Sequence, residues 1–234
     1  MTPLRVVMLG PFGLHPKGTM RARALPAARM LAARGHTVDV VMPPWHTPDE
    51  ADRAWRDEPS GVGVRYVSLR RSRAPGVGHA LVARRLADAA TELAPDVVHL
   101  FKPKAYSGLA GVLLRGRQRL GTRFRLVVDT DDWEGRGGWN ELEPYPRAMR
   151  AFFAWQERWG LTHADAVTVA SRALETLAWS LGVKAARVTY LPNALEGTGG
   201  ADGAVLRSAD AALPPSDRAA PGAGPVLLLY TRFF

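Results

Sequence analysis

Short apolar runs rich in β-branched residues alternate with longer stretches of helical periodicity along most of this chain. The apolar runs predict strands at residues 4–9, 37–42, 64–68, 97–101, 126–129, 166–169 and 188–191. Between them, the periodicity predicts helices at 21–34, 79–93, 106–119, 146–162 and 171–181. Most of the runs are apolar throughout, as is typical of parallel strands that helices cover on both faces. The alternation therefore predicts an α/β fold with a doubly wound parallel sheet.

The composition changes near residue 195. The segment 196–224 is rich in Gly, Ala, Pro, Ser and Asp and has little hydrophobic periodicity, which is typical of a flexible linker. The segment 225–234 then begins with an apolar run that resembles a buried strand. A single apolar strand needs a sheet to join. We therefore predict one domain over 1–195, a linker over 196–224, and the first strand of a second, truncated α/β domain over 225–234.

The composition excludes several classes of protein. With 234 residues, 47% of them hydrophobic, the chain is long and apolar enough for a sizeable core, so disorder is not expected. It has no cysteine, which removes disulfides, zinc–thiolate sites and thiol nucleophiles and favours a cytoplasmic location. No uncharged apolar run approaches the roughly 18 residues of a membrane span, and the N-terminus does not resemble a signal peptide.

The chain is basic, with 31 Lys and Arg against 22 Asp and Glu and a net charge of +9. Such a charge attracts anionic partners without identifying them. Only four of the basic residues are Lys, a bias that genome composition can produce, so we do not predict specific binding of nucleic acid. Arginines gather at 70–73, 84–85 and 115–125. Peripheral contact with an anionic membrane is one interpretation of these clusters, and an ordinary charged surface is the favoured one.

A glycine-containing loop follows the first predicted strand. It runs from Gly10 to Thr19 and includes four candidate substrate contacts: Gly13, His15, Lys17 and Gly18. Glycines let a backbone approach a ligand closely, and the start of the next helix offers N–H groups to an anion. The spacing matches neither Gly-x-Gly-x-x-Gly nor the P-loop pattern. Arg21 and Arg23, which follow the loop, are expected either to reach an anion there or to be solvated.

Three carboxylates at the end of the fifth predicted strand form the sharpest candidate site. Asp129, Asp131 and Asp132 are followed directly by Trp133. Open α/β sheets bind ligands at the carboxyl ends of their strands. Carboxylates this close repel one another, which raises a pKa and yields an acid or base, or attracts a cation. The Asp-x-Asp spacing also fits metal-nucleotide binding or a metal-dependent phosphatase, although the phosphatase pattern normally lies on the first strand.

The exit of the fourth predicted strand carries Lys102 and Lys104, which are expected either to face an anion or to be solvated. His99, within that strand, is expected to be a packed strand residue. The aromatic residues of the 146–162 helix are expected in the core rather than on a ligand platform; they are Phe152, Phe153, Trp155 and Trp159.

Several segments together resemble the N-terminal half of glycosyltransferase family 4, which has the GT-B fold. The matching segments are residues 9–18, 31–38, 95–99, 164–171 and 191–193, and the strand at 226–232 resembles the start of that family's second domain. The resemblance covers nearly the whole chain. Each segment is loose by itself, but their order and spacing together are fairly specific. The resemblance implies a Rossmann-like domain that forms the acceptor-binding half of a two-domain enzyme.

The activity implied is transfer of a sugar from a nucleotide-sugar donor to a glycan, lipid or small-molecule acceptor, with retention, without a cofactor and without a bound metal. Many members carry a His-Asp pair after the fifth strand. Aligned with it, Asp131 takes the His position and Asp132 follows, so these two become the catalytic candidates, and Asn193 joins the substrate-binding ones. An Asp cannot act like a neutral imidazole. The alternatives are a non-catalytic sugar- or phosphate-binding domain and a GT-B-fold sugar-nucleotide epimerase.

Overall fold

The computed structural model describes residues 2–16, 18–69 and 77–193. They form an eight-stranded sheet in the order β3-β4-β2-β1-β5-β6-β7-β8. Neighbouring strands are parallel, except that β3 is antiparallel to β4. The predicted α/β fold with a mostly parallel sheet is confirmed. The strands are β1 (Arg5–Leu9), β2 (Thr37–Met42), β3 (Ala54–Asp57), β4 (Val62–Tyr66), β5 (Val97–Phe101), β6 (Arg125–Thr130), β7 (Ala166–Val169) and β8 (Val188–Tyr190).

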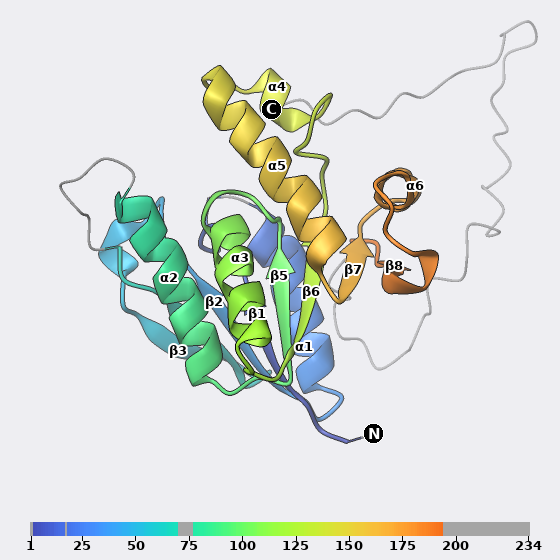
Figure 1. Cartoon of the computed structure of the whole chain (residues 1–234). Helices are drawn as coiled ribbons and strands as arrows, with labels where there is room; N and C mark the ends of the chain where they lie inside the picture. Colours follow the sequence, from blue (N-terminus) through green and yellow to red (C-terminus); the bar gives the residue numbers. More distant parts are fainter. Residues whose placement is uncertain (1, 17, 70–76, 194–234) are drawn as a thin grey trace, which may run out of the picture. The chain divides into compact units, whose positions relative to one another are not determined.

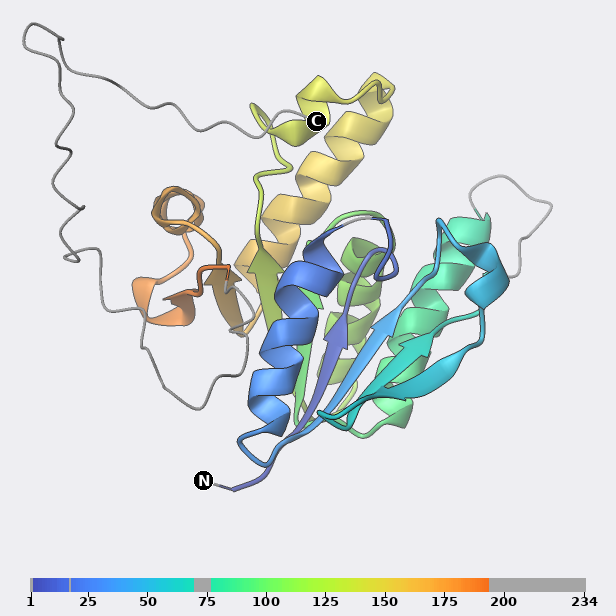
Figure 2. The same ribbon diagram turned by 180° about the vertical axis from the view of Figure 1, so that it is seen from behind.

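Helices cover both faces of the sheet. Helices α2, α3 and α5 lie on one face in Figure 1, and α1 lies on the other, as the reverse view in Figure 2 shows. A π-helical turn at Met20–Ala24 leads directly into α1. The helices are α1 (Leu25–Ala32), α2 (Val77–Glu92), α3 (Ala105–Arg119), α4 (Trp139–Leu142), α5 (Arg147–His163) and α6 (Arg172–Ser180), with 3-10 turns at Pro48–Glu50 and Ala185–Arg187.

The two faces of the sheet bury two separate cores. Successive side chains of a strand point to opposite faces, so β5 sends Val98 and Leu100 toward α2 and α3, and Phe101 toward α1. The same alternation on β6 directs Val128 to the α5 face. Thr130 shares that face, whereas Asp129 points to the α1 face. The end of β6 therefore presents polar side chains to both helical layers.

The helices and strands predicted before residue 194 are all present, with boundaries that differ by no more than two residues when the π-helical turn is counted with α1. Ser171 caps α6, as its side chain accepts a hydrogen bond from the Leu174 amide at 3.2 Å. Two elements were not predicted. Strand β3 is a half-exposed edge strand without an apolar run, and α4 is only four residues long. The predicted linker and terminal strand lie outside the described residues.

The expectation that the aromatic residues of α5 lie in the core is wrong for two of them. Phe153 is 8% exposed, but Phe152 and Trp155 are 39% and 45% exposed. The buried face of α5 carries Phe153, Gln156, Glu157, Gly160 and Leu161. Residues 152, 155 and 159 project from the opposite side, where the ring of Trp155 stacks on Phe152 and lies tilted against Trp159. Helical periodicity alone does not reveal which of two apolar faces the sheet will cover.

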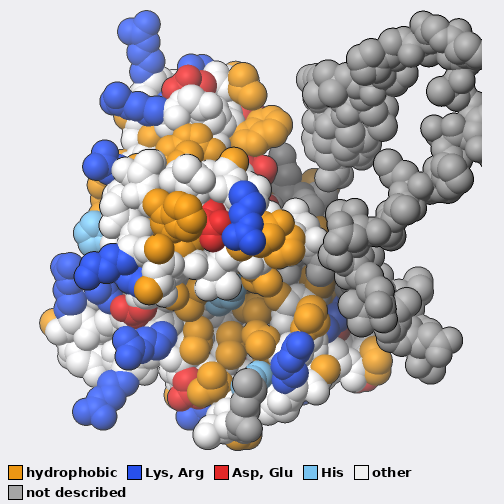
Figure 3. Space-filling view, turned by 90° about the vertical axis from the view of Figure 1, so that its right-hand side faces the viewer, with side chains coloured by type: hydrophobic (Ala, Val, Ile, Leu, Met, Phe, Trp, Pro, Cys, Tyr) orange, Lys and Arg blue, Asp and Glu red, His pale blue; other side chains and the backbone are white. Residues whose placement is uncertain are grey.

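On the face in Figure 3, Lys and Arg side chains are scattered and form no single continuous patch. Arg115 pairs with Asp165 at 3.1 Å, and Arg117 pairs with Asp88. Residues 70–73 lie outside the described part of the chain. Among the described helices, none is long and apolar enough to cross a membrane.

Candidate functional site

The candidate site lies at the carboxyl edge of the sheet, beside the point where the strand order reverses. β1 and β5 are neighbours there, and open α/β sheets bind ligands at such a position. The glycine loop leaves β1, Lys102 leaves β5, and Asp131 leaves the next strand, β6. The Thr19 hydroxyl, at the end of the glycine loop, donates to Asp131 Oδ2 at 2.8 Å. The three segments therefore converge at one edge, as their positions after parallel strands predict.

Lys102 is the charge centre of this edge. Its ammonium Nζ lies 3.1 Å from Asp132 Oδ2, 3.0 Å from Glu134 Oε1 and 3.8 Å from Asp131 Oδ1. Burial alone would lower the pKa of Lys102, but the charges of Asp131, Glu134 and Asp132 raise it well above its usual value. Lys102 is therefore a permanent cation in the site. It is ion-paired rather than solvated.

The backbone of Lys102 adopts a left-handed conformation, with φ of 51°. This is costly for a residue with a side chain and occurs where the surroundings impose it. The Lys102 amide donates to the Asp129 carbonyl at 2.9 Å, and its own carbonyl accepts from the Ser107 hydroxyl. These bonds fix the turn to β6 on one side and to α3 on the other. The ammonium is thereby held over the carboxylates.

Asp129 does not face solvent. Both of its carboxylate oxygens accept hydrogen bonds from Arg23, at 2.7 Å from Nε and 2.6 Å from Nη2. The side chains of Arg23 and Asp129 are 3% and 0% exposed. Burial raises the pKa of Asp129, and Arg23 opposes that rise; the two-pronged geometry fits the ionised carboxylate. A ligand would have to displace Arg23, so the geometry does not support the expected substrate contact at Asp129.

A hydrogen-bond chain extends from Asp129 across the α1 face of the sheet. The Thr168 hydroxyl donates to Asp129 Oδ2, and its oxygen lies 3.0 Å from His99 Nε2. Because a hydroxyl has a single hydrogen, we assign the proton of this contact to His99 Nε2, which makes His99 a neutral donor. Burial, aided by the charge of Arg23, lowers the pKa of His99 to about 3. His99 is therefore the packed strand residue that its position predicts.

The two catalytic candidates differ in accessibility. The Asp132 side chain is 43% exposed and pairs with Lys102, whereas that of Asp131 is 12% exposed. Asp131 Oδ1 is buried and accepts no hydrogen bond. Burial raises the pKa of Asp131, helped by Asp132 and opposed by Lys102. Asp132 can meet a ligand directly, while a ligand reaches Asp131 Oδ1 only if the glycine loop or Lys102 moves aside.

Each of the three aspartates lies beside an organic cation. Arg23 forms an ion pair with Asp129 on the α1 face, and Lys102 forms ion pairs with Asp131 and Asp132. Within residues 2–16, 18–69 and 77–193, no three His, Asp or Glu side chains gather in a way that could hold a metal ion. Asp129 and Asp131, the two carboxylates of the Asp-x-Asp spacing, therefore pair with different cations.

The other predicted contacts are placed as follows. Gly13 packs against Tyr66, whose hydroxyl accepts from the Leu14 amide at 3.2 Å, while His15 and Gly18 lie exposed beyond it. Lys17 lies outside the described residues. Trp133 is partly buried against the core and donates from Nε1 to the Arg136 carbonyl at 2.7 Å. It organises its own loop.

Asn193 is exposed and joins the buried ion pair. Its Oδ1 accepts from Arg23 Nη1 at 3.0 Å, and the same nitrogen donates to the Leu191 carbonyl at 2.7 Å. Arg23 thus ties the segment that leaves β8 to the end of β6. Arg21, on the same π-helical turn, is exposed.

Sequence reasoning missed two carboxylates. Glu134 is 3% exposed and bridges Lys102 and Lys104, lying 2.7 Å from the Lys104 ammonium. Glu157 of α5 is fully buried and contacts Thr130. The signal for Glu157 was available, because Glu157 shares a helix face with Phe153, Gly160 and Leu161.

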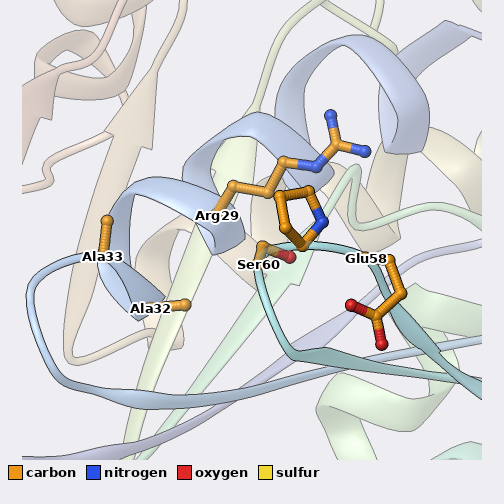
Figure 4. A pocket seen from close by; sticks show the side chains of 6 residues that line it. Arg29, Ala32, Ala33, Glu58 and Ser60 are labelled. Carbon is orange, nitrogen blue, oxygen red and sulfur yellow. The ribbon is translucent and has the colours of Figure 1, made fainter.

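A pocket of about 610 Å³ lies elsewhere, between the end of α1 and the β3–β4 turn (Figure 4). Its lining includes Arg29, Ala32 and Glu58. Both segments adjoin the edge where the parallel strands begin. The pocket is therefore remote from the candidate site.

A sequence model described as a glycosyl transferase 4-like domain matches residues 18–194. The chain belongs to this family. The match covers most of the chain and includes the exits of β5 and β6, whereas β1 and most of the glycine loop precede it. Among curated proteins, no sequence matches the chain significantly.

Solved structures similar to this glycosyl transferase 4-like chain share its fold at low identity. One is a UDP-GlcNAc 2-epimerase from Neisseria meningitidis bound to UDP-GlcNAc, with TM-score 0.55 and 11% identity over 81% of this chain and 47% of that one. Another is the lipopolysaccharide outer core galactosyltransferase WaaB, with TM-score 0.51 and 13% identity over 82% of this chain and 46% of that one. A third is Anabaena Alr3699/HepE in complex with UDP and glucose, with TM-score 0.50 and 16% identity over 82% of this chain and 45% of that one. The chain thus spans less than half the length of each.

Proposed function

We propose that this chain is the acceptor-binding half of a retaining, metal-independent glycosyltransferase that takes its sugar from a nucleotide-sugar donor. The observation that carries the proposal is the Lys102–Asp131–Asp132 cluster at the strand-order reversal of a domain that belongs to the glycosyl transferase 4-like family. Two of the structurally similar proteins were solved with UDP and a sugar or with a UDP-sugar, which supports a nucleotide-sugar as co-substrate.

Each carboxylate has a different part in this proposal. Asp132, the more exposed, accepts a hydrogen bond from an acceptor hydroxyl. Asp131 has an oxygen without a hydrogen-bond donor and a pKa raised by burial. When the donor is bound, Asp131 takes up a proton or stabilises positive charge at the anomeric carbon. Lys102 keeps both carboxylates in place and limits their repulsion.

The donor is held by a second domain in this proposal. Residues 225–234 are its first strand, 196–224 are the linker, and the ends of the two domains enclose the reaction. The acceptor is a hydroxyl-bearing glycan, lipid or small molecule, and the protein acts in the cytoplasm. For a lipid acceptor, the protein makes peripheral contact with an anionic membrane face.

The competing activity is sugar-nucleotide epimerisation, because an epimerase shares the fold. The test uses a protein that contains both this chain and a donor-binding half. It is incubated with a panel of nucleotide-sugars, and NMR of the products distinguishes transfer, epimerisation and binding alone. Transfer predicts that the free nucleoside diphosphate appears only when an acceptor is present and that a new glycoside forms. Epimerisation predicts a new nucleotide-sugar without acceptor. Binding of a sugar or phosphate without either product would favour the non-catalytic alternative.

A further inference from the structure

Two adjacent buried residues of α5 hold the two turns that build the candidate site. Gln156 accepts from the Ala105 amide at 2.9 Å and donates to the Ala105 carbonyl at 3.0 Å, which fixes the turn that carries Lys102. Its neighbour Glu157 lies with Oε1 2.8 Å from the Thr130 hydroxyl, where β6 ends and the Asp131–Asp132 turn begins. Helix α5 therefore sets the position of the cation relative to its carboxylates.

The Thr130 hydroxyl has two oxygen neighbours and one hydrogen to give. It lies 2.8 Å from Glu157 Oε1 and 2.8 Å from the backbone carbonyl of Asp132. The carbonyl can only accept, whereas a carboxyl group can donate when it is protonated, so both contacts are satisfied together only if the hydroxyl hydrogen goes to the carbonyl. The contact between Thr130 and Glu157 then needs a hydrogen from Glu157, which only the protonated carboxyl group has. The geometry alone thus favours a carboxylic acid at position 157.

The surroundings of Glu157 agree with a neutral group. Its side chain is fully buried, and its second oxygen, Oε2, has no hydrogen-bond partner. A buried carboxylate that lacked such a partner would be far more costly than the acid. Gly160 lets α5 come this close, because a Cβ there would lie 2.8 Å from Pro103 Cβ.

We infer that Glu157 is a positioning residue that works as a neutral acid: it donates to the Thr130 hydroxyl, which donates to the Asp132 carbonyl, and this relay holds the Asp131–Asp132 turn opposite Lys102. The relay itself stands on the geometry. Its importance for catalysis rests on the proposed function.

Loss of the Glu157 proton would break the relay. Burial raises the pKa of Glu157 to about 8, and the hydrogen bond between Glu157 and Thr130 opposes that rise. The charged groups that face it are Glu134, which raises its pKa further, Lys102, which lowers it, and Asp131, which raises it. Above that pH the Glu157 carboxylate competes with the Asp132 carbonyl for the one hydrogen of the Thr130 hydroxyl. The Asp131–Asp132 turn is then no longer held by that hydrogen bond.

Carboxyl ¹³C NMR of the 234-residue chain with labelled Glu tests the protonation without any assay of activity. We expect one Glu side-chain resonance that titrates near pH 8 and disappears in Glu157→Gln, whose amide can still donate to Thr130. In the matched control Glu175→Gln, on α6, that resonance should remain. Titration of the Glu157 resonance in the ordinary range of Glu would overturn the inference.

The positioning is read from the backbone amides of Asp131 and Asp132 in the same sample. In the unchanged chain they should shift with the Glu157 titration, and in Glu157→Gln and Thr130→Val that shift should be lost. Amides that do not follow the titration in the unchanged chain would refute the relay, even if Glu157 is protonated. An inactive whole protein with both NMR results intact would count against the proposed function alone.

Discussion

Arg23 and Asp129 form a buried two-pronged ion pair that joins the π-helical turn before α1 to the end of β6, although 106 residues separate them in sequence. Nη1 of the same guanidinium binds the Leu191 carbonyl and Asn193, where the chain leaves the sheet. One cation thus links the glycine-loop side of the site, its central strand and the exit toward residue 194. A buried charge that loses its partner is costly, which makes the pair testable by stability.

Arg23→Met should destabilise the chain by about 3–5 kcal/mol, because it leaves the Asp129 carboxylate buried without a counter-charge. Asp129→Asn should have a similar effect, and the double variant should lose less than the sum. Arg53→Met is the control. It removes an exposed ion pair, in which the side chains of Arg53 and Glu50 are 60% and 34% exposed. It should change stability by no more than about 1 kcal/mol. Urea unfolding measures all four; equal losses for Arg23→Met and Arg53→Met would contradict the assignment.

The neutral His99 should make the protein sensitive to acid. Its pKa is lowered to about 3 in the folded state from the usual 6.5, so the unfolded chain binds an extra proton between these values. Stability should therefore fall as the pH falls from 6.5 toward 3. His99→Gln should flatten this decline in thermal melts recorded across that range. A decline of the same steepness in the variant would show that other groups cause it.

Glu157 should produce the opposite slope. Its pKa is raised from 4.5 to about 8, so the folded state holds a proton that the unfolded chain releases. The stability that it contributes is complete below pH 4.5 and is lost as the pH rises to 8, a difference on the order of 5 kcal/mol. Glu157→Gln should be the more stable protein at pH 9. Parallel pH profiles for the two proteins would contradict this.

The sequence predicts the fold and the convergence of the strand exits for physical reasons that apply to any parallel sheet. The apolar runs identify β1, β2 and β5 as covered strands, and carboxyl ends of parallel strands share one edge, which brings Lys102 to Asp131. Which side chains meet inside depends on register and helix rotation. Asp129 faces Arg23 because it lies on the α1 face of β6, and Glu157 reaches Thr130 because Gly160 admits α5 closely. Neither pairing leaves a local pattern.

The 234 residues alone should not transfer sugar, because the proposed reaction takes place between two domains. We expect weak or no binding of nucleotide-sugars by calorimetry. Removal of residues 197–234 should leave the melting temperature nearly unchanged, since the described residues before that point already form two buried cores. Sugar transfer by the isolated chain would contradict the two-domain account. A large loss of stability on truncation would show that the terminal segment belongs to the first domain.

The central claim is that Asp131 acts in sugar transfer, and single-turnover transfer by the whole protein tests it most directly. Asp131→Asn should lower the rate by about a hundredfold or more, because it removes a carboxylate from proton transfer or charge stabilisation. Asp132→Asn should act mainly on the acceptor KM. Glu92→Gln, at an exposed position at the end of α2, is the control and should leave the rate unchanged. Undiminished transfer by Asp131→Asn, or activity that a chelator abolishes and manganese restores, would contradict the account.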